Sequence, residues 1–263
     1  MPYAISDGIR ISYDDSGHGS EPVLLFLPGW CGSRAVFERL ATRCASRRRI
    51  LSLDWRGHGQ SETSSDDFGT GDLVEDALAV IAASKAEKVV PVALSHAGWV
   101  AIELRRRLGA RIPKLVLLDW IVLDAPAPFL GALQSLQDPE QWQGTRDHLF
   151  QMWLHGVDNQ ELSAYLRNDM GTYAFDMWAR AGREISAAYN AAGSPLRALA
   201  AFDSPAPALH MYAQPVDPGY LAAQRSFAAE HPWLDVAKLE ARSHFPMLEV
   251  PNEMATRIDE FIA

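Results

Sequence analysis

Four short, almost uninterrupted apolar runs alternate with helical patterns over the first 120 positions, and this alternation most constrains the fold. The runs are PVLLFLP (22–28), RILSLDW (49–55), KVVPVAL (88–94) and PKLVLLDW (113–120). Strands without polar alternation must be buried on both faces, which happens when helices cover both sides of a parallel sheet. The pattern therefore predicts an α/β fold with a mostly parallel sheet covered by helices on both faces.

Further strands are expected at both ends of the chain. The turn pair Asp7-Gly8 separates two β-rich runs, so we expect residues 2–14 to form an antiparallel hairpin at a sheet edge. Near the C-terminus, APALHMYA (206–213) and WLDVAKLE (233–240) have the composition of two last strands, and NEMATRIDEFIA has the pattern of a closing amphipathic helix.

The strand pattern is interrupted after Pro126. From there to about residue 200 the chain has the pattern of several helices rich in large side chains. These are Phe129, Trp142, Phe150, Met152, Trp153, Tyr165, Tyr173, Phe175, Met177, Trp178 and Tyr189. Because there are no repeats, low-complexity tracts or linkers, we expect residues 1–263 to form a single domain, with residues 126–200 as a helical cap inserted after the sixth strand.

Composition and charge narrow the class of partner. Hydrophobic residues make up 48% of the chain and charged residues 22%, so a large core can form without disulfides or metals. The net charge of -9 disfavours nucleic acid and anionic membrane surfaces and leaves a small molecule as the expected partner. No secretion signal or membrane-spanning run is visible, and Cys31 and Cys44 suit a reducing compartment, so we expect a cytoplasmic protein. The oligomeric state stays open.

Ser95 stands at the junction of a predicted strand and a predicted helix. The strand KVVPVAL runs directly into SHAGW (95–99), and Ala93 and Ala97 occupy the positions where a nucleophile elbow usually carries glycine. Such an elbow needs small neighbours because its sharp turn holds the serine in a strained conformation above the sheet. A serine N-cap on an ordinary helix is the alternative. The context of strand, turn and helix favours the elbow.

His244 lies in RSHFP (242–246), just beyond the last predicted strand, where the α/β-hydrolase fold places a catalytic histidine. An isolated histidine more often lies in a surface loop, but the position and the chain order favour catalysis. Three aspartates are candidates for the acid that would pair with this histidine. Asp217 holds the commoner position in hydrolases, and Asp124 is a weaker choice. Asp119 ends an apolar strand, where an ionised carboxylate needs a partner such as an imidazole.

A second glycine turn follows the strand PVLLFLP. Gly29 lets the backbone turn there, so the amides of Trp30 and His96 are expected to polarise a bound oxygen together. The segment DWRGHGQS (54–61) is typical of the fold, and we interpret His58 as structural. The chain has no Rossmann glycine pattern after a strand, no Walker loop and no H-E-x-x-H, and its eight histidines are scattered. Neither a cofactor nor a metal is therefore expected.

Taken together, these segments resemble the cofactor-free 3-hydroxy-4-oxoquinoline 2,4-dioxygenases, a small branch of the α/β-hydrolase superfamily. The resemblance covers most of the chain from Leu27 to Pro246, and LLDW and HLFQMWLHG are far more specific than the elbow. It is carried by PGWCG, DWRGHGQS, SHAGW, LLDW, DPEQWQGTRDHLFQMWLHG, AAGSP, AEHPW and SHFP.

The resemblance implies a role for each site residue. In that family the histidine is a base, the aspartate of the LLDW strand assists it, and the serine is not a covalent nucleophile; here these are His244, Asp119 and Ser95. Trp153 would line the substrate cavity. The base would remove the 3-hydroxyl proton of a quinolone, and the electron-rich anion would react with O₂ without a cofactor, releasing carbon monoxide and leaving an N-acylanthranilate.

Two positions depart from the family pattern. Members acting on a methylated quinolone carry histidine where Gly32 and Leu94 stand here. Losing two bulky polar groups predicts a larger or more apolar pocket, in which Gly32 and Leu94 leave space for an alkyl tail. The resemblance therefore points to substrates of the 2-alkyl-3-hydroxy-4(1H)-quinolone class, such as the heptyl-bearing Pseudomonas quinolone signal.

Two other functions stay open on the residues alone. A serine esterase or amidase would use Ser95, His244 and either Asp119 or Asp217 in acyl transfer, and the fold cannot separate the two chemistries because it hosts many reactions. A non-catalytic ligand-binding member of the fold would be expected to lack the histidine or the serine. The presence of both argues against that third function.

Overall fold

The computed structural model describes residues 2–19 and 21–263, and within them the chain forms an eight-stranded sheet in the order β1-β2-β4-β3-β5-β6-β7-β8. The strands are β1 (Tyr3–Ser6), β2 (Ile9–Ser16), β3 (Val23–Leu27), β4 (Ile50–Leu53), β5 (Val89–Leu94), β6 (Leu115–Leu118), β7 (Ala208–Tyr212) and β8 (Leu234–Lys238). β1 pairs with β2, and β2 with β4, in antiparallel fashion, whereas all later pairs are parallel. The expected mostly parallel sheet is confirmed.

The edge hairpin forms where the sequence predicts it. Asp7 and Gly8 both have positive φ, at 48° and 82°, as a tight two-residue hairpin turn requires. In contrast to this edge, every residue of β3, β5 and β6 is buried. The apolar runs are thus buried on both faces of the sheet. The cause is that helices cover both sides.

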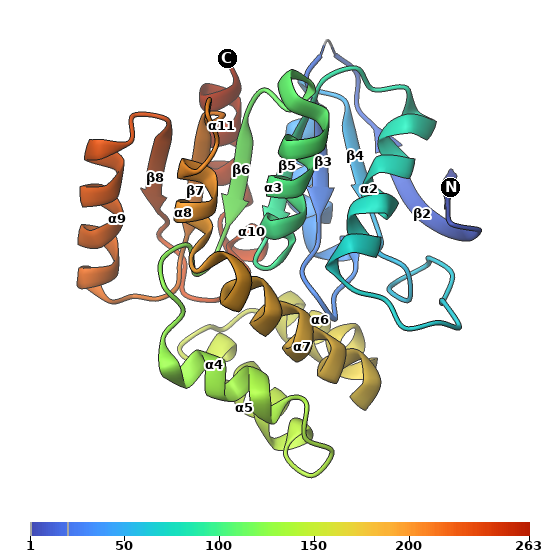
Figure 1. The fold of residues 1–263 in the computed structure, drawn as a ribbon, viewed down its shortest axis with the longest axis vertical. Helices are drawn as coiled ribbons and strands as arrows, with labels where there is room; N and C mark the ends of the chain where they lie inside the picture. Colours follow the sequence, from blue (N-terminus) through green and yellow to red (C-terminus); the bar gives the residue numbers. More distant parts are fainter. Residues whose placement is uncertain (1, 20) are drawn as a thin grey trace.

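Two helical layers enclose the sheet (Figure 1). On one side lie α2 (Thr70–Ser84), α3 (Ala97–Leu108) and α8 (Pro195–Ala200). On the other lies α11 (Pro251–Ile262), against which α1 (Glu38–Ala45) packs. The closing helix α11 buries Met254, Ala255, Ile258 and Ile262, which share one face at helical spacing. α9 (Pro218–Glu230) lies beside β8, and the short α10 (Pro246–Glu249) precedes α11.

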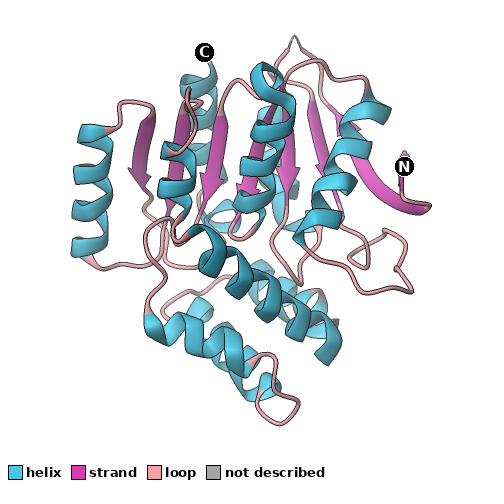
Figure 2. Ribbon diagram, in the orientation of Figure 1, coloured by secondary structure: helices cyan, strands magenta, loops and turns pink. Residues whose placement is uncertain are grey.

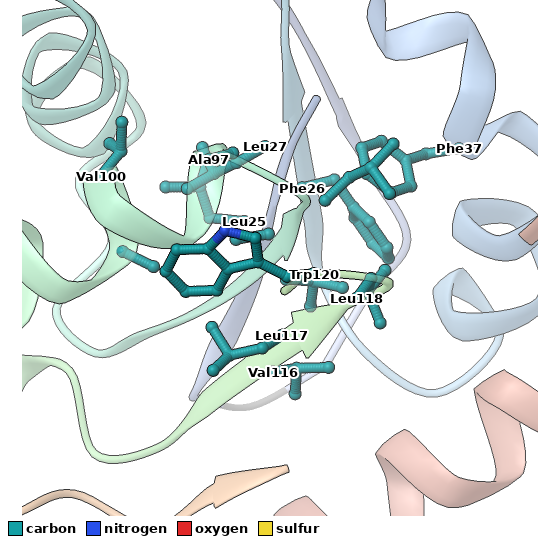
Figure 3. Packing of buried hydrophobic residues seen from close by; sticks show 14 of the residues in the cluster. Leu25, Phe26, Leu27, Phe37, Ala97, Val100, Val116, Leu117, Leu118 and Trp120 are labelled. Carbon is teal, nitrogen blue, oxygen red and sulfur yellow. The ribbon is translucent and has the colours of Figure 1, made fainter. Parts of the chain in front are cut away.

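The core directly beneath the Ser95 turn is tightly packed. Figure 3 shows Trp120 among buried apolar side chains that include Leu25, Ala97 and Leu117. Its ring occupies the place that a side chain at Gly98 would need, so any larger residue there would collide with the indole. The packing of Trp120 thus requires glycine at position 98, in the first turn of the helix after Ser95.

A helical cap lies over the carboxyl ends of the parallel strands, whose arrows point towards it in Figure 2. We use the word cap for the helices α4 (Ala127–Ser135), α5 (Trp142–Leu154), α6 (Gln160–Asn168) and α7 (Phe175–Ala192). They follow β6, the sixth strand, as the sequence predicts. Across the described part of the chain, no helix combines the length and apolar character needed to cross a membrane.

Candidate active site

Ser95 occupies a strained turn between β5 and α3. Its φ is +53°, a left-handed conformation that is uncommon for residues other than glycine. The Ser95 amide donates to the carbonyl of Leu118 at 2.8 Å, which ties the turn to the end of β6. Ala93 and Ala97, on either side, are buried. The local geometry is that of a nucleophile elbow.

His244 and Asp119 form a hydrogen-bonded pair. The His244 Nδ1 atom lies 2.9 Å from Asp119 Oδ1, and the Asp119 side chain is 1% exposed against 18% for His244. The other carboxylate oxygen, Oδ2, accepts from the amides of Ala213 at 2.6 Å and Gln214 at 3.1 Å. Two amides and the imidazole therefore satisfy a carboxylate that is buried at the end of an apolar strand.

The other two acid candidates have different partners. Asp217 is exposed, and its side chain accepts from the amide of Gly219 at 3.0 Å, which caps α9. Asp124 forms an exposed ion pair with Arg197. The structure thus brings Asp119, and neither Asp217 nor Asp124, to the imidazole of His244.

The loop that carries His244 is fixed by a carboxylate on α10, a feature that the sequence reasoning missed. Glu249 Oε1 accepts from the amide of Ser243 at 2.8 Å and from its hydroxyl at 2.5 Å. The Ser243 oxygen in turn accepts from the amide of Phe245 at 3.1 Å. The residues on both sides of His244 are held in place, so its ring is preorganised before a ligand arrives. The only sequence signal was a glutamate six positions after the serine.

Trp30 and His96 lie side by side at the carboxyl end of the sheet. Their ring centroids are 6.0 Å apart, and both residues line the same cavity as Ser95 and His244. The Trp30 turn is held by His58, whose Nε2 accepts from the amide of Cys31 at 3.1 Å while Nδ1 donates to the carbonyl of Arg56 at 2.9 Å. Burial lowers the pKa of His58 to about 4, so its ring is neutral and serves as a structural support.

A large cavity of about 1230 Å³ lies between the cap and the sheet. Ser95, Asp119 and His244 all line it, and most of the remaining wall consists of apolar and aromatic side chains. Trp153 of α5 stacks on the His244 ring, with centroids 5.1 Å apart and planes inclined by 19°. Leu94, the last residue of β5, is buried and also lines the cavity. A wall of this composition suits a flat aromatic ligand.

The surroundings of Gly32 differ from the expectation that this residue leaves open space. It lines the cavity, but the space beside its α-carbon is filled by the hydroxyl group of Tyr165, which stands where a side chain at position 32 would begin. Tyr165 comes from α6 of the cap and is buried. The expectation that Gly32 leaves space for an alkyl tail is therefore wrong, because a cap residue distant in the sequence takes up the room that the missing side chain leaves.

The arrangement can move a proton in a largely apolar cavity. A carboxylate held by two amides orients the imidazole and stabilises its protonated form, which is the geometry of a general base. Among residues 2–19 and 21–263, no three histidine, cysteine, aspartate or glutamate side chains come together in a group that could hold a metal ion.

Comparison with known families identifies the scaffold and enzymes to which the chain is similar. Residues 24–257 match the alpha/beta hydrolase family. The 2-heptyl-3-hydroxy-4(1H)-quinolone dioxygenase of Mycobacteroides abscessus is 38% identical over 98% of this chain and 96% of its own. The 1H-3-hydroxy-4-oxoquinoline 2,4-dioxygenase of Pseudomonas putida is 36% identical over 97% of each chain.

Solved structures agree with this placement. An AqdC variant in complex with its substrate, the Pseudomonas quinolone signal, has a TM-score of 0.95 and 37% identity, covering 99% of this chain and 98% of the other. The enol-lactonase of Burkholderia xenovorans, with a TM-score of 0.79 and 18% identity over 99% of both chains, shares the fold alone. The chain therefore belongs to the quinolone 2,4-dioxygenase family within the alpha/beta hydrolases.

Proposed function

We propose that this protein cleaves 2-alkyl-3-hydroxy-4(1H)-quinolones with O₂ to an N-acylanthranilate and carbon monoxide, and that it needs neither a metal nor an organic cofactor. The observation that carries the proposal is the His244 and Asp119 pair that lines a large aromatic cavity, in a chain at least 36% identical to three named quinolone dioxygenases over most of its length. We further propose that residues 1–263 form one domain whose lid is the cap of α4 to α7, which is shorter than the expected range 126–200 because α8 packs on the sheet.

His244 acts first in the proposed mechanism. Its free Nε2 takes the proton of the 3-hydroxyl group, because Nδ1 is engaged with Asp119. Asp119 keeps the ring in this orientation and stabilises the imidazolium that forms. Trp153 covers one face of the imidazole by stacking on it, and the cavity that both residues line offers room for a planar heterocycle beside the base.

The deprotonated quinolone is then the reductant for O₂. One electron passes from the anion to oxygen, the two radicals combine at C2, and the resulting peroxide attacks C4. The O–O bond and the bonds from C3 to C2 and to C4 break, and C3 leaves as carbon monoxide with the oxygen of the former 3-hydroxyl group. One oxygen atom of O₂ remains on the former C2 as the amide oxygen and the other on the former C4 in the carboxylate, and the proton held by His244 passes to solvent. We assign the amides of Trp30 and His96 to the oxygen atoms on which negative charge develops, and the hydroxyl of Ser95 to a hydrogen bond with the substrate.

Oxygen dependence gives the direct test. Purified protein is incubated with 2-heptyl-3-hydroxy-4(1H)-quinolone with and without O₂, and quinolone absorbance, carbon monoxide and N-octanoylanthranilate are measured. We expect equal amounts of carbon monoxide and anthranilate, formed only with O₂, and unchanged turnover after treatment with a strong chelator. Turnover without O₂, or loss of activity that added metal restores, would contradict the proposal.

The length of the alkyl chain should control affinity. The wall of the cavity includes Phe129, Leu133, Leu149 and Ile185 from the cap, which offer apolar surface to a tail. Each methylene removed from water contributes about 0.8 kcal/mol, or roughly a fourfold gain in affinity. Calorimetric titration under anaerobic conditions with 2-methyl to 2-nonyl substrates should show Kd falling with each added carbon until the cavity is full. Equal Kd values for the methyl and heptyl compounds would mean that the tail binds elsewhere.

Ser95→Ala separates the dioxygenase from a serine esterase. An esterase needs the hydroxyl as its attacking atom, and loss of a triad nucleophile removes nearly all acyl transfer. The proposed dioxygenase loses only a hydrogen bond, on the order of 1–3 kcal/mol, so its turnover should fall about ten- to a hundredfold. Carbon monoxide release by Ser95→Ala is measured in air. Because alanine is strained at a φ of +53°, Ser95→Gly serves as the unstrained control. An acyl group found on Ser95 by mass spectrometry during quinolone turnover would contradict the dioxygenase mechanism and support a serine esterase.

A further inference from the structure

The His96 ring is linked to the cap by a short chain of hydrogen bonds. His96 Nε2 lies 3.1 Å from the Thr70 hydroxyl oxygen, and that hydroxyl donates to Glu184 Oε2 at 3.2 Å. The same carboxylate oxygen accepts from the Thr70 amide at 2.8 Å, at the beginning of α2. Glu184 belongs to α7 of the cap, so these hydrogen bonds join a cap helix to the residue that follows Ser95.

The positions of the protons in this row of hydrogen bonds follow from Glu184, the acceptor at its end. Glu184 accepts from the Arg183 guanidinium through Oε1 and from the Thr70 amide through Oε2, so both of its carboxyl oxygens act as acceptors. The single hydroxyl proton of Thr70 therefore goes to Glu184. The Thr70 oxygen is left as an acceptor for His96, which must carry its proton on Nε2.

The opposite tautomer is disfavoured by burial. His96 is 2% exposed, and its Nδ1 atom has no hydrogen-bond partner among the described residues. With the proton on Nδ1, a buried N–H would be left without an acceptor, which is rarer and costlier than an acceptor without a donor. Burial also lowers the pKa of His96 to about 3, which keeps the ring neutral.

The backbone makes room for the carboxylate. A β-carbon at Gly69 would lie 2.5 Å from Glu184 Oε2 and 2.7 Å from the carboxyl carbon, so a side chain there would displace the acid. Gly69 has a φ of -143°, which alanine adopts without strain. Gly69→Ala therefore pushes Glu184 away from Thr70 without changing any polar group.

We propose that Glu184 and Thr70 are positioning residues that hold the neutral His96 ring as its Nε2–H tautomer and thereby keep the His96 amide aligned for the oxygen atoms of the reaction. If the proton moved to Nδ1, Nε2 would have no donor to offer Thr70, whose own proton is engaged with Glu184, and His96 would lose its hydrogen bond to α2. The effect on turnover rests on the proposed function, whereas the tautomer does not.

Nitrogen NMR of the histidine rings tests the tautomer without substrate. In protein with ¹⁵N-labelled histidine, the His96 signals are assigned with His96→Asn, and long-range proton–nitrogen spectra show which ring nitrogen carries the proton. We expect Nε2–H alone in the unmodified protein and a mixture of tautomers in Thr70→Val and Gly69→Ala. Thr70→Ser keeps the hydroxyl and should restore Nε2–H.

Steady-state kinetics with the heptyl quinolone test the consequence. Loss of a whole oxyanion donor costs about 10² to 10³ in kcat, and a misaligned one less, so we expect kcat to fall about tenfold in Thr70→Val and Gly69→Ala with KM nearly unchanged. Arg39→Ala is the matched control, because Arg39 of α1 joins the core to Glu161 of the cap helix α6 and contacts neither Thr70 nor Glu184.

The outcomes separate this inference from the proposed function. An Nδ1–H signal in the unmodified protein, or a single tautomer and normal kcat in folded Thr70→Val and Gly69→Ala, overturns the positioning role. Altered tautomers with unaltered kcat overturn the link to catalysis. An equal loss of kcat in Arg39→Ala assigns the effect to contacts between cap and core in general and also overturns the proposal. Absence of quinolone turnover in the unmodified protein counts against the proposed function alone, because the tautomer is measured independently.

Discussion

A His244→Ala variant is expected to lose between about 10² and 10⁴ of quinolone turnover, because removal of a general base typically costs that much. No other basic group is hydrogen-bonded to Asp119 in the described structure, so the 3-hydroxyl proton would have to pass to water. The measurement is kcat for 2-heptyl-3-hydroxy-4(1H)-quinolone in air, together with anaerobic Kd. Binding should stay within about tenfold, since the apolar cavity wall is unchanged.

His18→Ala serves as the control for histidine replacement, because His18 is exposed at the end of the β2 hairpin and should keep normal turnover. Folding of both variants is checked by thermal unfolding. A folded His244→Ala protein with near-normal kcat would remove His244 from the mechanism. A loss of binding as large as the loss of kcat would instead make it a substrate ligand.

Asp119→Asn should lose a comparable factor, between about 10² and 10⁴ in kcat. The carboxylate stabilises the imidazolium and fixes its orientation, and in serine proteases the corresponding aspartate-to-asparagine change costs about 10⁴. Asparagine is preferred to alanine here because Asp119 has a φ of +40°, a conformation that asparagine tolerates well. The measurement is kcat as a function of pH, compared with the unmodified protein.

Asp217→Asn is the matched variant for this test. Asp217 is exposed and bonded to Gly219, so its replacement should change kcat far less than replacement of Asp119. A greater loss in Asp217→Asn, with both proteins folded, would place the acid at the commoner hydrolase position and would require the loop after β7 to rearrange around His244.

Much of the scaffold could be predicted because its signals are local. The fully buried strands β3, β5 and β6 are uninterrupted apolar runs, and the elbow is a strand that ends in a serine between small residues. Asp119 and His244 each directly follow a strand or its loop, and the carboxyl ends of parallel strands meet at one edge of a sheet. Proximity of these residues thus follows from strand order alone.

The wall of the cavity could not be predicted in the same way. Gly32 was expected to leave open space, yet the Tyr165 hydroxyl fills it from a helix more than a hundred residues later. The hydrogen bonds that link Glu184, Thr70 and His96 join three segments of the protein that no sequence periodicity connects. Glu249 supports Ser243 from within a few residues, but a single glutamate in a polar loop carries no distinctive pattern.

By itself, therefore, the sequence determined the sheet, the elbow, the histidine loop and, through family segments such as LLDW, the class of chemistry. The tertiary structure decided which acid contacts His244, which cap side chains fill the space beside Gly32, and which way the His96 ring is held. The physical reason is the distance along the sequence over which each kind of interaction acts. Strand burial and turn chemistry depend on neighbours along the chain, whereas cavity shape and proton position depend on side chains that meet only after the cap has packed on the sheet.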